Sequence, residues 1–137
     1  IAGATAALDV MIALGTHPPM SEEAICERLE LSLEERRESY GSVKFLNHEW
    51  DNPAALRHIG DITREEIREL TGGLFEMDVP VHINARLFEY DQVIILGPVF
   101  PHEVVGFSGG NKYLFPGVGG PAGGIDFFRG PTRIPRS

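Results

Sequence analysis

The stretch Asp9–Gly15 reads DVMIALG, and the later stretch Gln92–Leu96, just before Gly97, reads QVIIL. Each is a short apolar run that ends at a glycine, which is typical of a strand buried in a parallel sheet. Two further runs, Val43–Leu46 and Val79–Ile83, have a similar strand-like composition. Helix-like segments alternate with these runs. The sequence therefore predicts an α/β fold with an open, mostly parallel sheet flanked by helices.

The helices between these strands are marked by capping residues. Ser21 precedes two glutamates, and the pairs Ser32/Glu35 and Thr63/Glu66 have the spacing of a capping box. We expect a helix to begin after each of these three residues. Apolar residues expected on the buried faces follow at helical spacing: Ile25 and Leu29 in the first helix, and Ile67, Leu70 and Leu74 in the third.

Composition limits the size and class of the protein. The 137 residues suffice for one modest domain, and no apolar run has the length of about 20 residues that a membrane helix needs. The net charge is −8, without the basic patch that nucleic-acid binding requires. A single cysteine, Cys26, excludes an internal disulfide and favours the reducing cytoplasm. Because the chain opens without methionine, we interpret residues 1–137 as a piece of a longer protein.

Two histidines follow predicted strands at corresponding places. His17 comes after the first apolar run through the sequence GTH, and His102 comes after the last one through GPVFPH. Loops beyond the strand ends of an open α/β sheet are where catalytic groups collect, and imidazole titrates near neutral pH. These residues are candidate acid/base groups. Two unrelated surface histidines in turns are the alternative at this stage.

Residues 106–112 read GFSGGNK, a short segment with three glycines that ends in a lysine. Backbone N–H groups around Ser108, Gly109 and Gly110, together with Lys112, have the ingredients of an anion-binding loop. Neither the P-loop spacing nor the dinucleotide fingerprint is present. A glycine-rich turn without a ligand is the alternative. The remaining histidines, which we expect to be hydrogen-bonded structural residues, are His48, His58 and His82.

Two long blocks together resemble a known family. The blocks ALGTHPPMSEEA (residues 13–24) and GPVFPHEVVGFSGGNKYLFPGVGG (residues 97–120) are similar to the N-terminal domain of nickel-dependent lactate racemases. The resemblance implies an isomerase that inverts a small 2-hydroxy acid by proton-coupled hydride transfer. It implies a nickel pincer nucleotide as cofactor, attached covalently to Lys112 as a thioamide. It also implies that His17 and His102 are the paired acid/base residues. The resemblance further implies that residues 1–137 are a fragment of the family's N-terminal domain, with an upstream segment and a C-terminal domain outside this sequence.

The chain departs from the family pattern near its end. The histidine that ligates nickel is expected in a stretch that here reads DFFRG (Asp126–Gly130), with Arg129 in its place. The protein ligand of the metal is therefore unknown from the sequence, as are the particular hydroxy acid and the oligomeric state. The alternative function is a non-catalytic domain that binds a nucleotide or another anion at residues 106–112 and has lost nickel.

Overall fold

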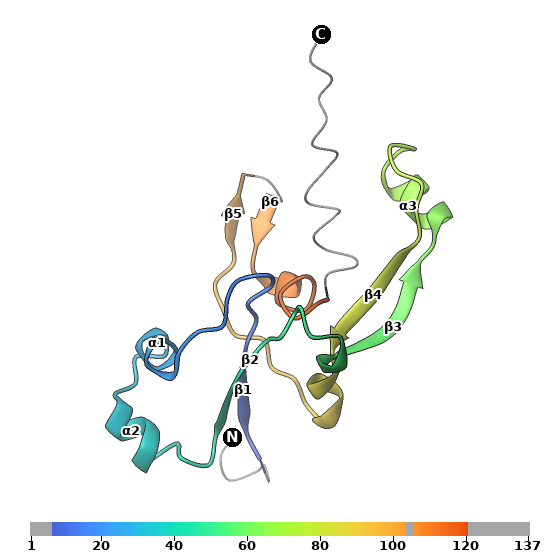
Figure 1. Ribbon diagram of the computed structural model, residues 1–137. Helices are drawn as coiled ribbons and strands as arrows, with labels where there is room; N and C mark the ends of the chain where they lie inside the picture. The colour runs from blue at the N-terminus through green and yellow to red at the C-terminus, as the bar shows by residue number, and fades with distance from the viewer. Residues whose placement is uncertain (1–6, 104–105, 121–137) are drawn as a thin grey trace.

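A parallel pair of strands lies at the centre of the protein. The computed structural model describes residues 7–103 and 106–120. Strand β1 (Asp9–Ile12) pairs with β2 (Lys44–Asn47), and the connection between them contains helices α1 (Glu22–Arg28) and α2 (Leu33–Glu38). A parallel pair needs such a crossover, because its second strand must start again at the same end as the first. Figure 1 shows both helices to one side of the pair.

The predicted caps are present. The Ser21 side chain accepts a hydrogen bond from the backbone N–H of Ala24, 3.2 Å away, at the start of α1. Complete capping boxes are formed by Ser32 with Glu35 at the start of α2 and by Thr63 with Glu66 at the start of α3. These bonds satisfy N–H groups that have no partner inside the helix. The three helix starts predicted from the sequence are confirmed.

The second unit of the fold is an antiparallel hairpin. Strand β3 (Leu56–Ile62) pairs with β4 (Val79–Asn84), with an irregularity in register between His58 and Gly60. Helix α3 (Arg64–Leu70) lies in the connection between the two strands. The short 3₁₀ helices η1 and η2 flank the hairpin at residues 53–55 and 85–89.

The predicted apolar stripe of α3 is wrong beyond its first member. Ile67 is buried, whereas Leu70 and Leu74 are 77% and 80% exposed. The helix ends at Leu70, and the two glycines that follow it adopt φ values of +62° and +86°. The chain therefore leaves the helical path before Leu74, which cannot continue the stripe.

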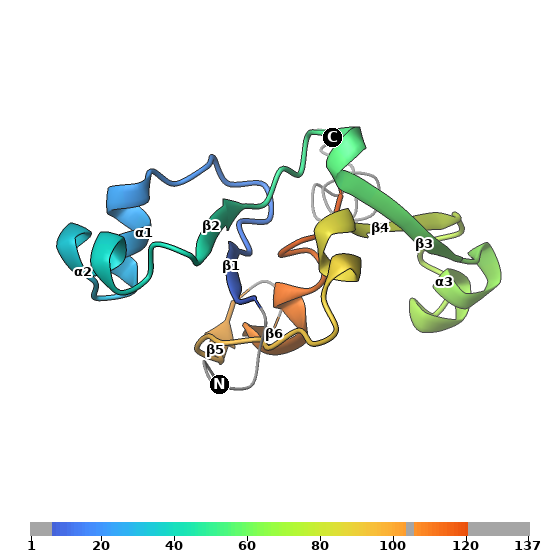
Figure 2. The ribbon, with the colours of Figure 1, turned by 90° about the horizontal axis from the view of Figure 1, so that it is seen from below.

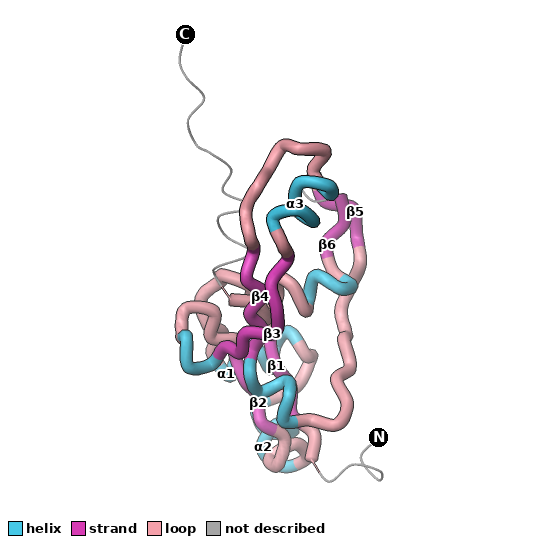
Figure 3. The backbone as a smooth tube through the Cα atoms, turned by 90° about the vertical axis from the view of Figure 1, so that its right-hand side faces the viewer, coloured by secondary structure: helices cyan, strands magenta, loops and turns pink. Residues whose placement is uncertain are grey.

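The last predicted strand, Gln92–Leu96, is not present. These residues form an irregular segment between η2 and the next strand, drawn as loop in Figure 3, and Leu96 is 92% exposed. An apolar run becomes a strand only where another strand offers its backbone hydrogen-bonding groups, which the run itself cannot specify. Within the described residues there are three two-stranded sheets, and only β1–β2 is parallel. The α/β class is confirmed, with sheets that are smaller and more mixed than predicted.

The glycine-rich segment occupies the region between the β1–β2 pair with its two helices and the β3–β4 hairpin. Strands β5 (Phe100–His102) and β6 (Gly106–Ser108) form a short antiparallel hairpin, followed by the 3₁₀ helix η3 (Gly110–Tyr113). In Figures 1 and 2, α1 and α2 lie on one side of this region, and β3, β4 and α3 lie on the other. Buried apolar side chains are spread over all these parts: Leu14, Ile25, Cys26, Ile67, Val79, Ile83 and Val118.

Candidate functional site

The β5–β6 hairpin leads directly into the turn that bears Lys112. Ser108 ends β6 opposite Phe100, and η3 begins two residues later. The Lys112 ammonium donates a hydrogen bond to the backbone carbonyl of Phe107, so the side chain folds back towards the hairpin. Lys112 is half-buried in this position. We call residues 109–117 the lysine turn.

The two glycines before Lys112 are required by the backbone. Gly109 and Gly110 have φ values of +85° and +59°, a backbone region that residues other than glycine rarely adopt. A Cβ atom on Gly109 would also overlap the backbone carbonyl of Pro98. The absence of a side chain at Gly109 is therefore accounted for by the close approach of the backbone at Pro98. The cofactor-binding roles of Ser108, Gly109 and Gly110 stay predictions.

The loop that bears His17 is hydrogen-bonded to the lysine turn. The Gly15 N–H donates to the Gly117 carbonyl at 2.7 Å, and the Gly117 N–H donates to the Lys112 carbonyl at 2.8 Å. His17 itself is exposed, and its N–H donates to the carbonyl of Leu14 at 3.1 Å. Two segments that are distant in the sequence thus meet through backbone hydrogen bonds.

His102 lies at the other end of the hairpin from the lysine turn. It pairs in register with Gly106 beside the hairpin loop, whereas η3 continues from the end marked by Phe100 and Ser108. Two strand residues separate these ends, which corresponds to about 7 Å at 3.3 Å per residue. The hairpin thus connects His102 to Lys112 through regular structure. The acid/base roles of His17 and His102 stay predictions.

A buried polar pair lies beside the lysine turn, and the sequence did not mark it as part of the site. His48 and Asn84 are each 2% exposed. His48 Nε2 lies 2.9 Å from the Gly119 carbonyl, and His48 Nδ1 lies 3.0 Å from Asn84 Nδ2. Burial lowers the pKa of His48, because the charged imidazolium loses its hydration. Adjacent Ile83 and Asn84 are both buried although they lie on opposite faces of β4, so strand alternation does not mark Asn84 and no sequence signal indicated this pair.

The other two histidines lie on the β3–β4 hairpin. His58 Nε2 is 3.1 Å from the Asp61 carboxylate, and the His58 and His82 rings are 5.1 Å apart between centroids. The hydrogen-bonded structural role expected from the sequence is confirmed for His48 and His58. His82 contributes its backbone carbonyl, which accepts from the Gly120 N–H at 3.0 Å.

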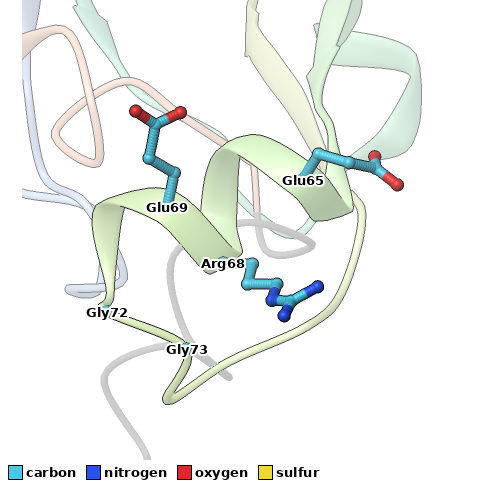
Figure 4. A pocket seen from close by; sticks show the side chains of 5 residues that line it. All are labelled: Glu65, Arg68, Glu69, Gly72 and Gly73. Carbon is cyan, nitrogen blue, oxygen red and sulfur yellow. The ribbon is translucent and has the colours of Figure 1, made fainter.

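A shallow hollow beside α3 does not include any predicted site residue. It is lined by Glu65, Arg68, Glu69, Gly72 and Gly73. Figure 4 shows Arg68 directed towards the chain that follows the helix, while Glu65 and Glu69 project elsewhere. Arg68 forms an ion pair with Glu76 at 3.3 Å, with both side chains well exposed. The hollow is a solvated helix surface.

Residues 7–103 and 106–120 contain no group of three or more His, Cys, Asp or Glu residues arranged to hold a metal ion. Arg129, where the sequence pattern placed the expected metal ligand, lies outside the described residues. None of the described helices is both long and apolar enough to cross a membrane.

The sequence matches the lactate racemase N-terminal domain over residues 2–123. The chain belongs to this family. The match includes both sequence blocks, the His17 loop and the lysine turn, and it confirms the resemblance inferred from those blocks. Membership connects this lactate racemase domain to a racemase-related role, without assigning a reaction to the chain itself.

A solved structure supports the fold. The lactate racemase domain is similar to the crystal structure of a protein from Thermotoga maritima, with 36% sequence identity and a TM-score of 0.72. The similarity covers 85% of this chain and 27% of the T. maritima chain. The domain therefore spans about a quarter of the length of that neighbour. No curated protein matches the chain.

Proposed function

We propose that this chain is part of a racemase or epimerase of small 2-hydroxy acids that uses a nickel pincer nucleotide held on Lys112. The observation that carries the proposal is the backbone connection from Gly15 through Gly117 to Lys112. It joins the loop of one candidate base to the candidate attachment residue, within a chain that matches the racemase domain. The free thiol of Cys26 is buried, which fits a cytoplasmic protein.

The two histidines would move the protons of the reaction. Inversion at the α-carbon of a 2-hydroxy acid would require hydride to leave that carbon as the hydroxyl proton is lost. Hydride would then return to the opposite face of the planar 2-oxo acid as a proton returns to its oxygen. Imidazole accepts and returns protons near neutral pH, and the two candidates come from different segments, His17 from a loop and His102 from the end of strand β5. When bound, the pincer nucleotide supplies the hydride acceptor.

The described residues fit the attachment of this group. Lys112 offers a primary amine at the surface, and its hydrogen bond to Phe107 is with a carbonyl on its own hairpin. A thioamide at this nitrogen would be uncharged and would keep one N–H, so the bond to the Phe107 carbonyl is expected to weaken when the group is attached. Ser108, Gly109 and Gly110 precede it in the same turn and are the proposed contacts of the nucleotide. The protein ligand of nickel is not assigned.

Mass spectrometry and metal analysis of the full-length protein test the proposal. Protein purified from a cell able to make the cofactor should contain nickel and an adduct on the peptide of Lys112. Lys112→Arg should abolish the adduct, and Lys44→Arg, the matched control on an exposed strand position, should retain it. His102→Ala should retain the adduct and lose racemisation.

Two results would contradict these roles. Retained racemisation in His102→Ala would exclude the two-base assignment. Unmodified, metal-free wild-type protein from such a cell would refute the racemase proposal. If that protein bound a nucleoside monophosphate at residues 106–112, the non-catalytic anion-binding alternative would replace it.

A further inference from the structure

His48 contacts both of the segments that meet at the candidate site. Its backbone N–H donates to the carbonyl of Ile12, the last residue of β1, at 3.2 Å. Its side chain reaches the carbonyl of Gly119, two residues after the Gly117 carbonyl that holds the His17 loop. A single buried residue thus connects the strand before the His17 loop to the chain after the lysine turn.

The hydrogen bonds around His48 select one form of its ring. The Asn84 Oδ1 atom accepts from the Arg86 N–H at 3.1 Å, so the Asn84 amide directs its N–H towards His48 Nδ1. Nδ1 must then be the acceptor, and Nε2 must bear the proton that is donated to the Gly119 carbonyl. Only the neutral, Nε2-protonated ring satisfies both partners, since a proton on Nδ1 would face the Asn84 donor.

The same short segment is held by further backbone bonds. The Asn84 N–H donates to the backbone carbonyl of Val118 at 2.9 Å, and the Gly120 N–H donates to the backbone carbonyl of His82 at 3.0 Å. Residues 117–120 are all buried. The chain beyond the lysine turn is therefore fixed to β4 on one side, while Gly117 remains bonded to Gly15 on the other.

We propose that His48, oriented by Asn84, is a positioning residue that fixes the lysine turn against the His17 loop. The proposal deepens the function proposed above and rests on it for the role of the site, while the positioning itself is a property of the fold. Without the bond to Gly119, residues 117–120 lose a buried contact on the side of β2, and the Gly15–Gly117 and Gly117–Lys112 bonds open more often.

Hydrogen exchange separates this effect from a general loss of stability. In the full-length protein, His48→Phe retains the ring volume but removes both hydrogen bonds. Exchange in peptides covering residues 13–20 and 112–118 should rise about ten-fold, because a buried carbonyl and a buried amide lose their partners. Exchange in a peptide covering α3 should not change. His48→Gln offers one donor and one acceptor, as the neutral imidazole does, and should restore slow exchange.

The matched controls and the functional readout use the same preparations. His58→Phe and His58→Gln change an exposed histidine and should leave both peptides as in the wild type. Provided that the wild type contains the Lys112 adduct, His48→Phe should lower kcat by about ten-fold or more, since small displacements of reacting groups are costly. KM should change less than kcat, and His48→Gln should recover most of the loss.

The exchange results test the positioning role of His48 directly. Unchanged exchange in both peptides, or an equal rise in the α3 peptide, would overturn the positioning role. If His48→Phe does not fold, His48→Asn replaces it, because the shorter amide reaches only the Nδ1 position, and equal exchange in the Asn and Gln variants would then overturn the role. A wild type without adduct or activity would refute the proposed function alone, since the exchange comparison does not depend on the cofactor.

Discussion

Replacing Gly117 by alanine should disturb the lysine turn through steric overlap. A Cβ atom at this position would lie 2.5 Å from the Tyr113 carbonyl oxygen, 2.7 Å from Tyr113 Cα and 2.8 Å from the Lys112 carbonyl oxygen. Ordinary contacts to a Cβ atom begin at 3.4 Å. All three atoms belong to the backbone, so the overlap can be relieved only by moving the turn itself.

The expected cost follows from these contacts. Overpacking in a close-packed region costs about 1–3 kcal/mol, and the rigid backbone neighbours place Gly117→Ala near the upper value. Displacement also weakens the Gly117–Lys112 hydrogen bond, which contributes about 1 kcal/mol. We expect the free energy of unfolding to fall by about 3–4 kcal/mol in total.

Gly120→Ala is the matched control in the same buried segment. Its Cβ atom would meet Leu56 Cδ1 at 2.7 Å and His82 Cβ at 3.0 Å, and the leucine side chain can rotate away. We expect a loss of about 1 kcal/mol or less for this variant. The reduced freedom of the unfolded chain on replacing glycine by alanine is common to both variants and cancels in the comparison.

Urea unfolding of the full-length proteins, with circular dichroism as the readout, measures both values. The slope of the unfolding curve should stay constant, so that the midpoint alone reports the difference. A Gly117→Ala midpoint equal to or higher than that of Gly120→Ala would refute the reasoning, because the backbone neighbours would then not be rigid.

Three further predictions concern stability. Burial lowers the pKa of His48, so the unfolded chain gains its proton first as the pH falls below the ordinary value of 6.5. The free energy of unfolding should fall by at most about 1.4 kcal/mol per pH unit there, and a pH series on His48→Gln should lack that component. Thr63→Ala should cost about 1 kcal/mol by urea unfolding, since it removes a capping box, and an unchanged midpoint would contradict this. Tyr90→Phe removes the 2.5 Å bond to the Asp9 carboxylate and should cost about 1–2 kcal/mol; thermal unfolding at the wild-type temperature would count against it.

The sequence predicted the features that depend on neighbouring residues. The capping boxes of Ser32 and Thr63 join atoms only three residues apart, so the local pattern determines them. Strands β1, β2 and β4 were likewise found within a few residues of their observed bounds. The two sequence blocks also identified the loop of His17 and the turn of Lys112, although nothing in either block showed how the two would meet.

The features that depend on distant partners were not predicted. The His48 ring bonds to Gly119, and no residue near His48 indicates that partner. The run Gln92–Leu96 has strand-like composition, but pairing requires an edge that the run does not contain. Leu70 is apolar and correctly spaced, yet nothing in the described structure covers it, so it stays exposed. Each of these depends on how segments that are distant in the sequence are arranged in space.

The bond between Gly15 and Gly117 has a consequence for the order of events on the ribosome. Its two partners lie about a hundred residues apart, so closing this loop has a substantial entropy cost that must be met before the contact forms. The β1–β2 pair and the two helices between its strands join residues that are much closer in the sequence and can form earlier. The Met20 end of the His17 loop is hydrogen-bonded to the Asn47 side chain, whereas its Gly15 end has to wait for Gly117 to be synthesised. The candidate site is therefore expected to be among the last parts of this segment to become ordered during translation.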